Sequence, residues 1–349
     1  MPPAAAPAPP PALVPVADPS AAAGADATIL VATPGERGAF AAELAAAALL
    51  DAHALSSVAV LAAPTAAGGR LVFSPTGPLD RDMDDVRRVA DAVARGVKRA
   101  VAAGARAPLL LLPASVTARG GAFAQALLVA LVAVCDALYV PLSVRLGKPQ
   151  PAVGGAVGSV FVHAAGVPAE ELAAAARTAR AIALGKGVAK DVGGSDPELG
   201  APPQCAAYLQ AAFAGVPGVS VSVEDDAAQI AAKYPLAGAV ARASLHVPRH
   251  HPRIVRLEYH NNGSGGGGAP AQQLYLVGKG ITYDTGGADI KTGGHMGGMS
   301  RDKCGAAGVA GFVRAVAELA PPGLRVVALL GFVRNSTGSD RCVCAPRGC

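Results

Sequence analysis

Two lysines and two aspartates crowd a glycine-rich stretch of the sequence, GKGITYDTGGADIK, which runs from residue 278 to residue 291. Glycine-rich loops that carry a lysine are typical of phosphate binding, because backbone N–H groups and an ammonium group surround the anion. Clustered carboxylates instead indicate a metal site, because hard divalent cations prefer oxygen ligands. The residue types alone leave both chemistries open.

The phosphate interpretation fails on the context of the glycines. A P-loop needs GxxxxGK followed by Ser or Thr, between a strand and a helix. Here Lys279 is followed by Gly280 and Ile281. A dinucleotide-binding GxGxxG opens a helix, whereas Gly278 and Gly280 precede the strand-forming run ITY. The stretch is therefore not expected to bind phosphate.

The metal interpretation depends on two carboxylates. Asp284 ends an expected strand, and strand ends are where α/β folds present functional groups. Asp302 stands at the expected start of a helix and is predicted to lie beside Asp284. Their oxygens suit Mn²⁺, Mg²⁺ or Zn²⁺. A simpler alternative, in which Asp302 is a helix N-cap and Lys291 a surface charge, stays open at this point.

Lysines would add two further chemical roles to such a site. A lysine that is desolvated beside divalent ions can lose its proton and become a nitrogen ligand, since burial and nearby positive charge both lower its pKa. A second lysine that keeps its proton can polarise a carbonyl group and stabilise an oxyanion.

The spacing of these residues favours the metal interpretation. VGKGITYDTGGADIK, followed by HMGGMSRD, resembles the signature of the leucyl aminopeptidase family, the two-metal cytosol aminopeptidases. Lys279, Asp284, Lys291 and Asp302 match the family positions, with gaps of 5, 7 and 11 residues. The resemblance extends from about Asp191 to about Asp340. The residues around the matched positions resemble those of a divergent branch of the family.

The resemblance implies a role for each of these four residues. Lys279 matches a neutral lysine that ligates one metal ion, and Asp302 matches a ligand in the same site. Asp284 matches a carboxylate shared by two divalent ions, Mn²⁺ or Zn²⁺. Lys291 matches the catalytic lysine that stabilises the gem-diolate formed during peptide hydrolysis. Such enzymes release N-terminal residues from peptide substrates in the cytoplasm and generally assemble as homohexamers.

One part of the family pattern is missing from the 349 residues. The family carries a later NTDAEGR segment, whose aspartate and glutamate complete both metal sites and whose arginine helps to hold a bicarbonate that acts as the base. No such segment occurs here, and the sequence after Asp340 is RCVCAPRGC. The catalytic domain is therefore expected to be incomplete, C-terminally truncated and under-coordinated toward its metal ions.

This deficit leaves the activity of the chain open. We expect a metal-dependent aminopeptidase by family, with little or no turnover from this chain. The alternative is a non-catalytic binding or assembly protein that keeps the fold of an aminopeptidase. A third alternative is an α/β protein that binds a small ligand through its N-terminal half alone.

The elements that must position these residues follow an α/β pattern. Short apolar runs alternate with alanine-rich helical stretches, which predicts βαβ units and a largely parallel sheet. The expected strands are residues 27–33, 57–63, 107–115, 158–166, 219–225, 252–260, 273–285 and 325–336. The expected helices are residues 40–54, 86–102, 123–137, 168–187, 203–213, 225–234 and 304–322.

We predict a disordered Ala/Pro-rich tail and two domains. The tail is residues 1–26, because this segment is rich in Pro and Ala. It has no Lys or Arg, so a signal peptide or a transit peptide is not expected. Residues 27–190 form an N-terminal α/β domain with a mainly parallel sheet. Residues 191–349 form the incomplete α/β metallopeptidase catalytic domain, and the boundary lies at DVGGSDPELGAPP, which breaks all periodicity.

Charge and hydropathy argue against nucleic-acid and membrane partners. The net charge is +5, and the densest basic stretch has the helical spacing of a solvated face. The longest apolar run, residues 122–142, is interrupted by Gln125 and Asp136, so we expect a buried helix passing into a strand.

The remaining cysteines and histidines are expected to be structural. Cys135, Cys205 and Cys304 look like ordinary buried thiols of a reducing compartment. The other three cysteines crowd the final eight residues, where we expect a tail unrelated to the family rather than a zinc site. His250 and His251 are expected in a solvated linker.

Overall fold

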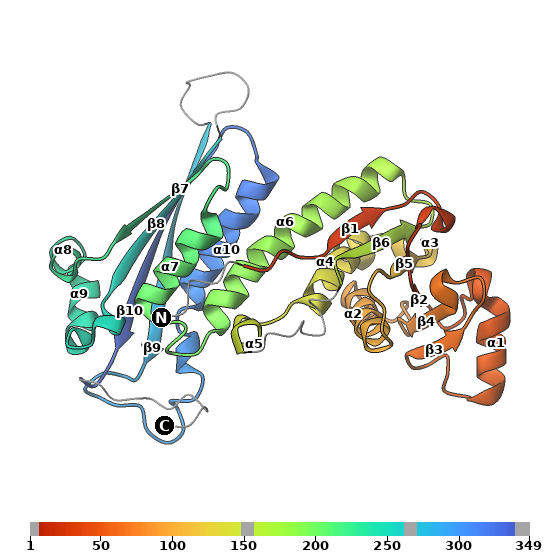
Figure 1. The fold of residues 1–349 in the computed structure, drawn as a ribbon, viewed down its shortest axis with the longest axis horizontal. Helices are drawn as coiled ribbons and strands as arrows, with labels where there is room; N and C mark the ends of the chain where they lie inside the picture. The colour runs from red at the N-terminus through yellow and green to blue at the C-terminus, as the bar shows by residue number, and fades with distance from the viewer. Residues whose placement is uncertain (1–6, 148–156, 262–270, 339–349) are drawn as a thin grey trace. The chain divides into compact units, whose positions relative to one another are not determined.

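The computed structural model describes residues 7–147, 157–261 and 271–338. The described chain divides into two compact units (Figure 1). The N-terminal unit holds Pro9–Val140 and the described residues up to Ala183. The C-terminal unit holds residues 141–147 and the described residues from Leu184 onward. Each unit has its own sheet and its own buried core.

A six-stranded sheet forms the centre of the N-terminal unit in the described part of the chain. Its strands lie in the order β1-β6-β5-β2-β4-β3, and every neighbouring pair is parallel except β3 and β4. The prediction of a mainly parallel sheet is confirmed. The strands are β1 (Ala12–Pro15), β2 (Thr28–Ala32), β3 (Ala59–Ala62), β4 (Arg70–Pro75), β5 (Leu109–Leu112) and β6 (Ser159–Ala164).

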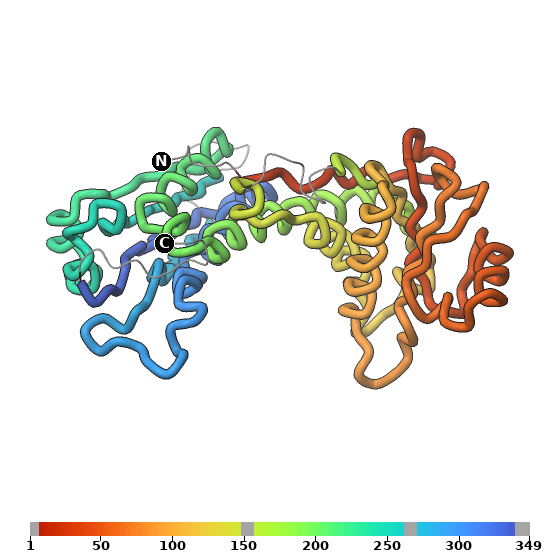
Figure 2. The backbone as a smooth tube through the Cα atoms, turned by 60° about the horizontal axis from the view of Figure 1, so that its bottom comes forward, coloured from red at the N-terminus to blue at the C-terminus, as the bar shows by residue number. Residues whose placement is uncertain are grey.

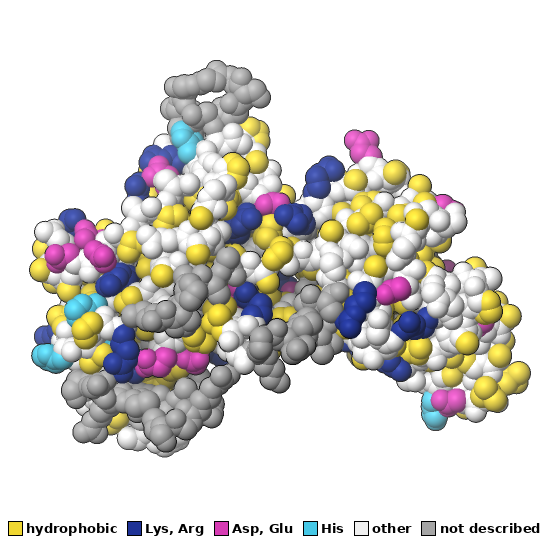
Figure 3. Space-filling model, viewed as in Figure 1, with side chains coloured by type: hydrophobic (Ala, Val, Ile, Leu, Met, Phe, Trp, Pro, Cys, Tyr) yellow, Lys and Arg dark blue, Asp and Glu magenta, His cyan; other side chains and the backbone are white. Residues whose placement is uncertain are grey.

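Amphipathic helices complete the core of this unit. In α2, Val89, Val93 and Val97 recur at helical spacing and are fully buried, while Arg87 and Lys98 stay exposed. The basic stretch is therefore the outer face of a helix, and Figure 3 shows Lys and Arg side chains interspersed with Asp and Glu on the visible face. The helices of this unit are α1 (Ala41–Leu50), α2 (Arg87–Ala102), α3 (Ala114–Thr117), α4 (Ala126–Leu138) and the first part of α6 (Ala169–Gly194). α5 (Leu142–Gly147) and α6 from Leu184 onward belong to the C-terminal unit.

The structure differs from the sequence expectations at three places in this half of the chain. Ala12–Pro15, expected in a disordered tail, forms β1 and pairs in parallel with β6, because an extended apolar segment at a sheet edge gains backbone hydrogen bonds. The apolar run that ends at Leu142 does not pass into a strand, since α5 follows α4. β4 was not predicted at all, although its residues from Leu71 to Pro75 are buried.

The helical stretch Gly121–Gly147 is the only one in the described residues that is long and apolar enough to cross a membrane. Within the fold, its central part is α4, whose side chains Ala130, Leu131 and Val134 are fully buried in the core of the N-terminal unit. This burial is typical of the core helix of a globular unit.

A mixed four-stranded sheet forms the centre of the C-terminal unit within the described residues, in the order β7-β8-β10-β9. β9 runs parallel to β10, and the other two pairs are antiparallel. Residues 285–303 form a long loop between β9 and α10 (Figure 2). The elements are α7 (Pro202–Phe213), β7 (Val219–Glu224), α8 (Ala227–Lys233), α9 (Pro235–Ala241), β8 (Arg253–His260), β9 (Gln272–Asp284), α10 (Cys304–Leu319) and β10 (Leu324–Asn335).

The domain boundary expected to begin at Asp191, in the segment DVGGSDPELGAPP, does not begin there. α6 continues through Asp191 to Gly194, and the two units divide at Ala183 and Leu184, inside this helix. Asp191 is fully buried and accepts a hydrogen bond from the Tyr208 hydroxyl at 2.7 Å, and it pairs with Arg145. This buried pairing stabilises the last turn of α6 despite its two glycines.

Close helix packing in the C-terminal unit yields a stability prediction. A Cβ at Gly311 of α10 would lie 2.5 Å from the carbonyl oxygen of Gly185 in α6. We expect Gly311→Ala to lower the free energy of unfolding by about 1 to 3 kcal/mol, because the helices must separate. Gly308→Ala, in the same helix with nothing within 4 Å, is the control and should gain up to about 1 kcal/mol from helix propensity. Urea unfolding measures both, and equal effects would contradict the packing argument.

Candidate metal centre

Lys279 and Asp302 form the first ion pair of the candidate site. The backbone N–H of Ile281 in β9 donates to the Asp302 carbonyl at 3.2 Å, which holds the segment before α10 against the strand. The Lys279 Nζ then lies 3.0 Å from the Asp302 Oδ1. The Lys279 side chain is 63% exposed, so the burial expected for a neutral lysine ligand is not found.

The second oxygen of Asp302 points to a cation-binding role. Asp302 Oδ2 is buried and has no hydrogen-bond partner among the described residues. A buried carboxylate oxygen is costly unless a donor or a cation compensates it. The alternative role as a helix N-cap is wrong, because Lys303 occupies the cap position of α10 and makes no side-chain cap hydrogen bond.

Asp284 and Lys291 form the second ion pair. The Lys291 Nζ lies 3.2 Å from the Asp284 Oδ2, and the Lys291 backbone N–H donates to the Thr285 carbonyl at 2.9 Å. The loop after β9 therefore folds back, so that Lys291 faces the end of its own strand. Its side chain is 29% exposed, which does not fit the alternative of a free surface charge.

The other oxygen of Asp284 accepts two hydrogen bonds. Asp284 Oδ1 receives the backbone N–H of Gly286 at 3.0 Å and the Asn335 Nδ2 at 2.7 Å. Burial raises the pKa of Asp284, but these two donors and Lys291 outweigh burial, so that its pKa is lowered overall. Asp284 is thus held as a carboxylate at the end of the strand.

An irregularity in the pairing of β9 and β10 sets this geometry. Val333 pairs with Ile281 and Asn335 pairs with Asp284, so Thr282 and Tyr283 both lie opposite a single residue of β10. Thr282 and Tyr283 are consequently both buried although they are adjacent in sequence. Such bulges occur beside active sites, where they change the direction of a side chain.

Beneath the bulge, Arg334 and His250 form a buried polar pair. Arg334 is 1% exposed and lies over the ring of Tyr283, with its guanidinium carbon 5.4 Å from the ring centre. Its Nη1 donates to the His250 Nε2 at 3.0 Å, and Glu198 lies 4.0 Å away. The expectation that His250 belongs to a solvated linker is wrong, since its side chain is 2% exposed.

A fully buried lysine anchors the start of α10. The Lys303 Nζ donates to the carbonyl of Ser195 at 2.9 Å and also to the carbonyl of Ser300. Burial lowers the pKa of Lys303 and raises the pKa of the neighbouring Cys205 thiol to about 12. Cys205 and Cys135 are buried as predicted, whereas Cys304, in the first turn of α10, is exposed. The C-terminal cysteines lie outside the described residues.

The donor set fits a divalent cation in part. One candidate lysine lies within β9, one carboxylate ends that strand and another precedes α10, where one carboxylate oxygen is buried without a partner in the described chain. Within the described ranges no group of three or more His, Cys, Asp or Glu side chains gathers at one point. Lys279, Asp284 and Asp302 are thus the residues that could hold an ion.

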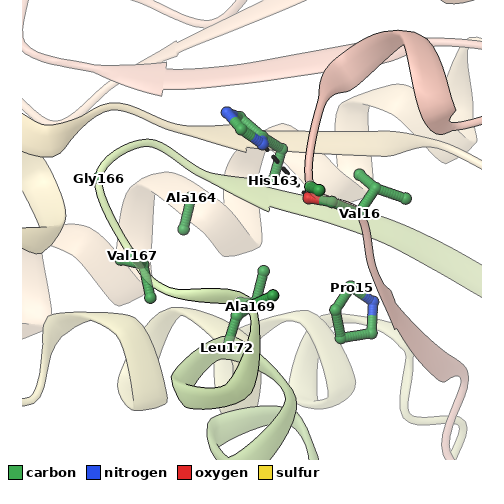
Figure 4. Close-up of a pocket in the computed structure, with 9 residues that line it drawn as sticks. Pro15, Val16, His163, Ala164, Gly166, Val167, Ala169 and Leu172 are labelled. Atoms are coloured by element: carbon green, nitrogen blue, oxygen red, sulfur yellow. Dashed lines mark hydrogen bonds between the residues drawn. The ribbon is translucent and has the colours of Figure 1, made fainter.

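Two cavities of the described chain lie in the N-terminal unit, away from these residues in sequence. One, of about 180 Å³, is lined by Val16, Val167 and Leu172, with His163 bonded to the Val16 carbonyl oxygen at 3.3 Å (Figure 4). The other, of about 460 Å³, is lined by residues that include Asp18 and Phe40. Neither contains a residue that the sequence motif selects.

Sequence reasoning missed the residues around Asp284. Asn335, Arg334 and Lys303 contact or flank the candidate ligands, yet no role was predicted for them. The only signal for Asn335 was its place in the RNSTGS segment that follows an expected strand.

Comparison with known families gives a match over the C-terminal unit. Residues 187–343 match the model of the cytosol aminopeptidase family, catalytic domain. A Caenorhabditis elegans protein named as an aminopeptidase, W07G4.4, is 39% identical over 280 residues, which are 79% of this chain and 50% of that protein. A protein of Azoarcus named as a cytosol aminopeptidase is 35% identical over 175 residues, 49% of this chain and 32% of its own length. The chain thus spans half or less of the length of these relatives.

Solved structures share the fold. A mutant of tomato leucine aminopeptidase superposes with a TM-score of 0.70 at 16% identity, over 95% of this chain and 65% of that chain. The bottromycin maturation enzyme BotP in complex with Mn superposes with a TM-score of 0.66 at 24% identity, over 90% and 60% of the two chains. At these identities the likeness shows the fold, and the expected α/β architecture is confirmed.

The buried His250 predicts a pH dependence of stability. The pKa of His250 is lowered to about 4, first by burial and then by the charges of Arg334 and Arg249, while Glu198 opposes the shift. His250 therefore takes up a proton near pH 6.5 in the unfolded chain but only near pH 4 in the folded chain. The contribution of neutral His250 to the free energy of unfolding is thus fully present above pH 6.5 and is lost as the pH falls toward 4. Over that range we expect a loss of roughly 2 to 3 kcal/mol in the free energy of unfolding.

Urea unfolding between pH 4.5 and pH 7 measures this loss. His250→Gln keeps an acceptor for Arg334 and should flatten the pH dependence relative to the wild type. His251→Gln, at the adjacent and only partly buried histidine, should leave it unchanged. Parallel pH profiles for the wild type and His250→Gln would contradict the assignment.

Proposed function

Because the chain belongs to the cytosol aminopeptidase family, we propose that it is a metal-dependent aminopeptidase, which removes N-terminal residues from peptides. The observation that carries the proposal is the pair of lysine–aspartate contacts: Lys279, within β9, with Asp302, and Lys291 with Asp284 at the end of that strand. The buried oxygen of Asp302 without a partner in the described chain supports a cation at this place.

Three residues are proposed as metal ligands. Lys279 and Asp302 would hold one divalent ion, and Asp284 would be shared between two, with Mn²⁺ or Zn²⁺ as the proposed metals. When bound, such ions polarise a peptide carbonyl group and lower the pKa of water. For Lys279 to act as a ligand, its ammonium group must lose a proton and leave the ion pair with Asp302.

Lys291 is proposed as the catalytic residue. Hydrolysis of a peptide bond places negative charge on the former carbonyl oxygen, and a positioned ammonium group stabilises that charge. The Asp284 carboxylate, 3.2 Å away, orients the Lys291 ammonium group. The hydrogen bond from the Lys291 backbone to Thr285 fixes the loop that carries it.

The number of metal ligands in the described residues limits the catalytic activity that we propose for this chain. The three candidate side chains in the described part of the chain are fewer ligands than two divalent ions require, and excess positive charge would be poorly neutralised. We therefore propose metal binding with weak turnover for the chain alone. The same donor count supports the second candidate, a non-catalytic aminopeptidase-like binding protein.

Metal binding and turnover separate these proposals. Asp302→Ala is expected to weaken Mn²⁺ binding at least tenfold by titration calorimetry, because it removes the buried ligand oxygen. Lys291→Ala is expected to leave Mn²⁺ affinity nearly unchanged and to reduce hydrolysis of leucine-4-nitroanilide by about 100-fold or more.

Lys98→Ala, at an exposed lysine of α2, is the matched control and should change neither property. A wild-type chain that binds no Mn²⁺ would overturn the metal centre. A chain that binds Mn²⁺ but does not turn over substrate would favour the non-catalytic candidate, and full turnover by Lys291→Ala would remove Lys291 from the mechanism.

We also propose a cytoplasmic homohexamer, on the basis of the family resemblance. Light scattering coupled to size-exclusion chromatography should then give six times the chain mass of 34.3 kDa. A mass of one or two chains at micromolar concentration would exclude a stable hexamer of these residues.

A further inference from the structure

Asn335 is the last residue of β10 and faces the proposed shared ligand. Its Nδ2 donates to the Asp284 Oδ1 at 2.7 Å, which is a short, charge-assisted hydrogen bond. A carboxylate can only accept, so the amide nitrogen rather than the amide oxygen must face Asp284. The contact joins residues 51 positions apart and depends on the strand register.

Two hydrogen bonds from Thr285 hold the backbone of Asn335 in this position. The Thr285 N–H donates to the Asn335 carbonyl at 3.0 Å, and the Thr285 hydroxyl donates to the same oxygen at 2.8 Å. Thr285 is 3% exposed, so water competes little for these bonds. Asn335 is therefore fixed at its backbone independently of its side chain.

The turn after Asp284 is shaped around the Asn335 side chain. Gly287 has a φ of 79°, and a Cβ there would lie 2.8 Å from the Asn335 Oδ1. A larger residue at position 287 would be strained in its backbone and would displace the amide. The Asn335 amide therefore packs closely against Gly287, in the turn that follows β9.

The two oxygens of Asp284 are consequently unequal. Oδ1 is engaged by two neutral donors, the Gly286 N–H and the Asn335 amide, that are fixed by the backbone and the register. Oδ2 faces the Lys291 ammonium alone among the contacts of the described chain. Rotation of the carboxylate would cost Oδ1 both of its donors.

We propose that Asn335 is a positioning residue, whose amide locks Asp284 so that Oδ2 is the oxygen presented to the metal ions and to Lys291. This inference rests on the proposed function, in which Asp284 is a ligand. Removal of the amide leaves Asp284 free to rotate and weakens metal binding, since partners of metal ligands typically contribute 10- to 100-fold in affinity.

The test is Mn²⁺ affinity of the full chain by titration calorimetry, with the thermal unfolding midpoint measured without metal. Asn335→Ala and Asn335→Ser both remove the amide, and Ser keeps a small polar side chain in the turn. We expect each to weaken Mn²⁺ binding 10- to 100-fold. Thr285→Val, the control, removes a hydroxyl bond to the Asn335 backbone but keeps the amide, and should lower the midpoint while affinity stays within about threefold.

The possible outcomes distinguish a positioning role of Asn335 from an effect on the stability of the turn and from the absence of a metal centre. Loss of affinity in both Asn335 variants, with Thr285→Val unaffected, supports the proposal. Equal affinity in all four proteins overturns it and leaves the proposed metal centre intact. An equal loss in Thr285→Val also overturns it, because Asn335 would then act only through the stability of the turn. Absence of Mn²⁺ binding by the wild type overturns the metal centre itself, and the positioning role with it.

Discussion

The parallel pairing of β9 with β10 is the constraint on which the candidate site depends. The two strands pair from Gln272 opposite Leu324 to Asp284 opposite Asn335, and the register shifts once, before the last pair. Because register fixes which residues face each other, that single bulge places the Asn335 amide against the Asp284 carboxylate. Shifting the register by one residue would turn Asp284 to the other face of the sheet.

Opposite charges then organise the loop that follows. Lys279, Asp284, Lys291 and Asp302 lie within 24 consecutive residues and form two lysine–carboxylate pairs, one at β9 and one at the returning loop. Each pair is partly exposed, so neither contributes much stability by itself. Their value is positional, because the first pair holds the segment before α10 against β9, and the second holds the loop after β9 at the end of that strand.

Much of the α/β pattern was predictable from local sequence. Apolar runs and amphipathic periodicity identified most strands and helices of the described chain, because burial on one face leaves a periodic trace, but they did not identify β1, β4, α3, α5 or α9. β1 was missed because a short Pro-flanked segment resembles a tail until a neighbouring strand offers hydrogen bonds. His250 and Cys304 were misplaced for a related reason, since exposure depends on which distant elements pack above a residue.

The sequence by itself determined the chemistry of the candidate site: which lysines and aspartates are present, their spacing, and the family to which that spacing belongs. Only the tertiary structure decided how they are held. The Asn335 amide, the buried Arg334 and His250 pair, and the unpartnered oxygen of Asp302 in the described chain arise from contacts between residues far apart in sequence. Local periodicity carries no record of such contacts, because strand register and helix packing are set by the whole sheet.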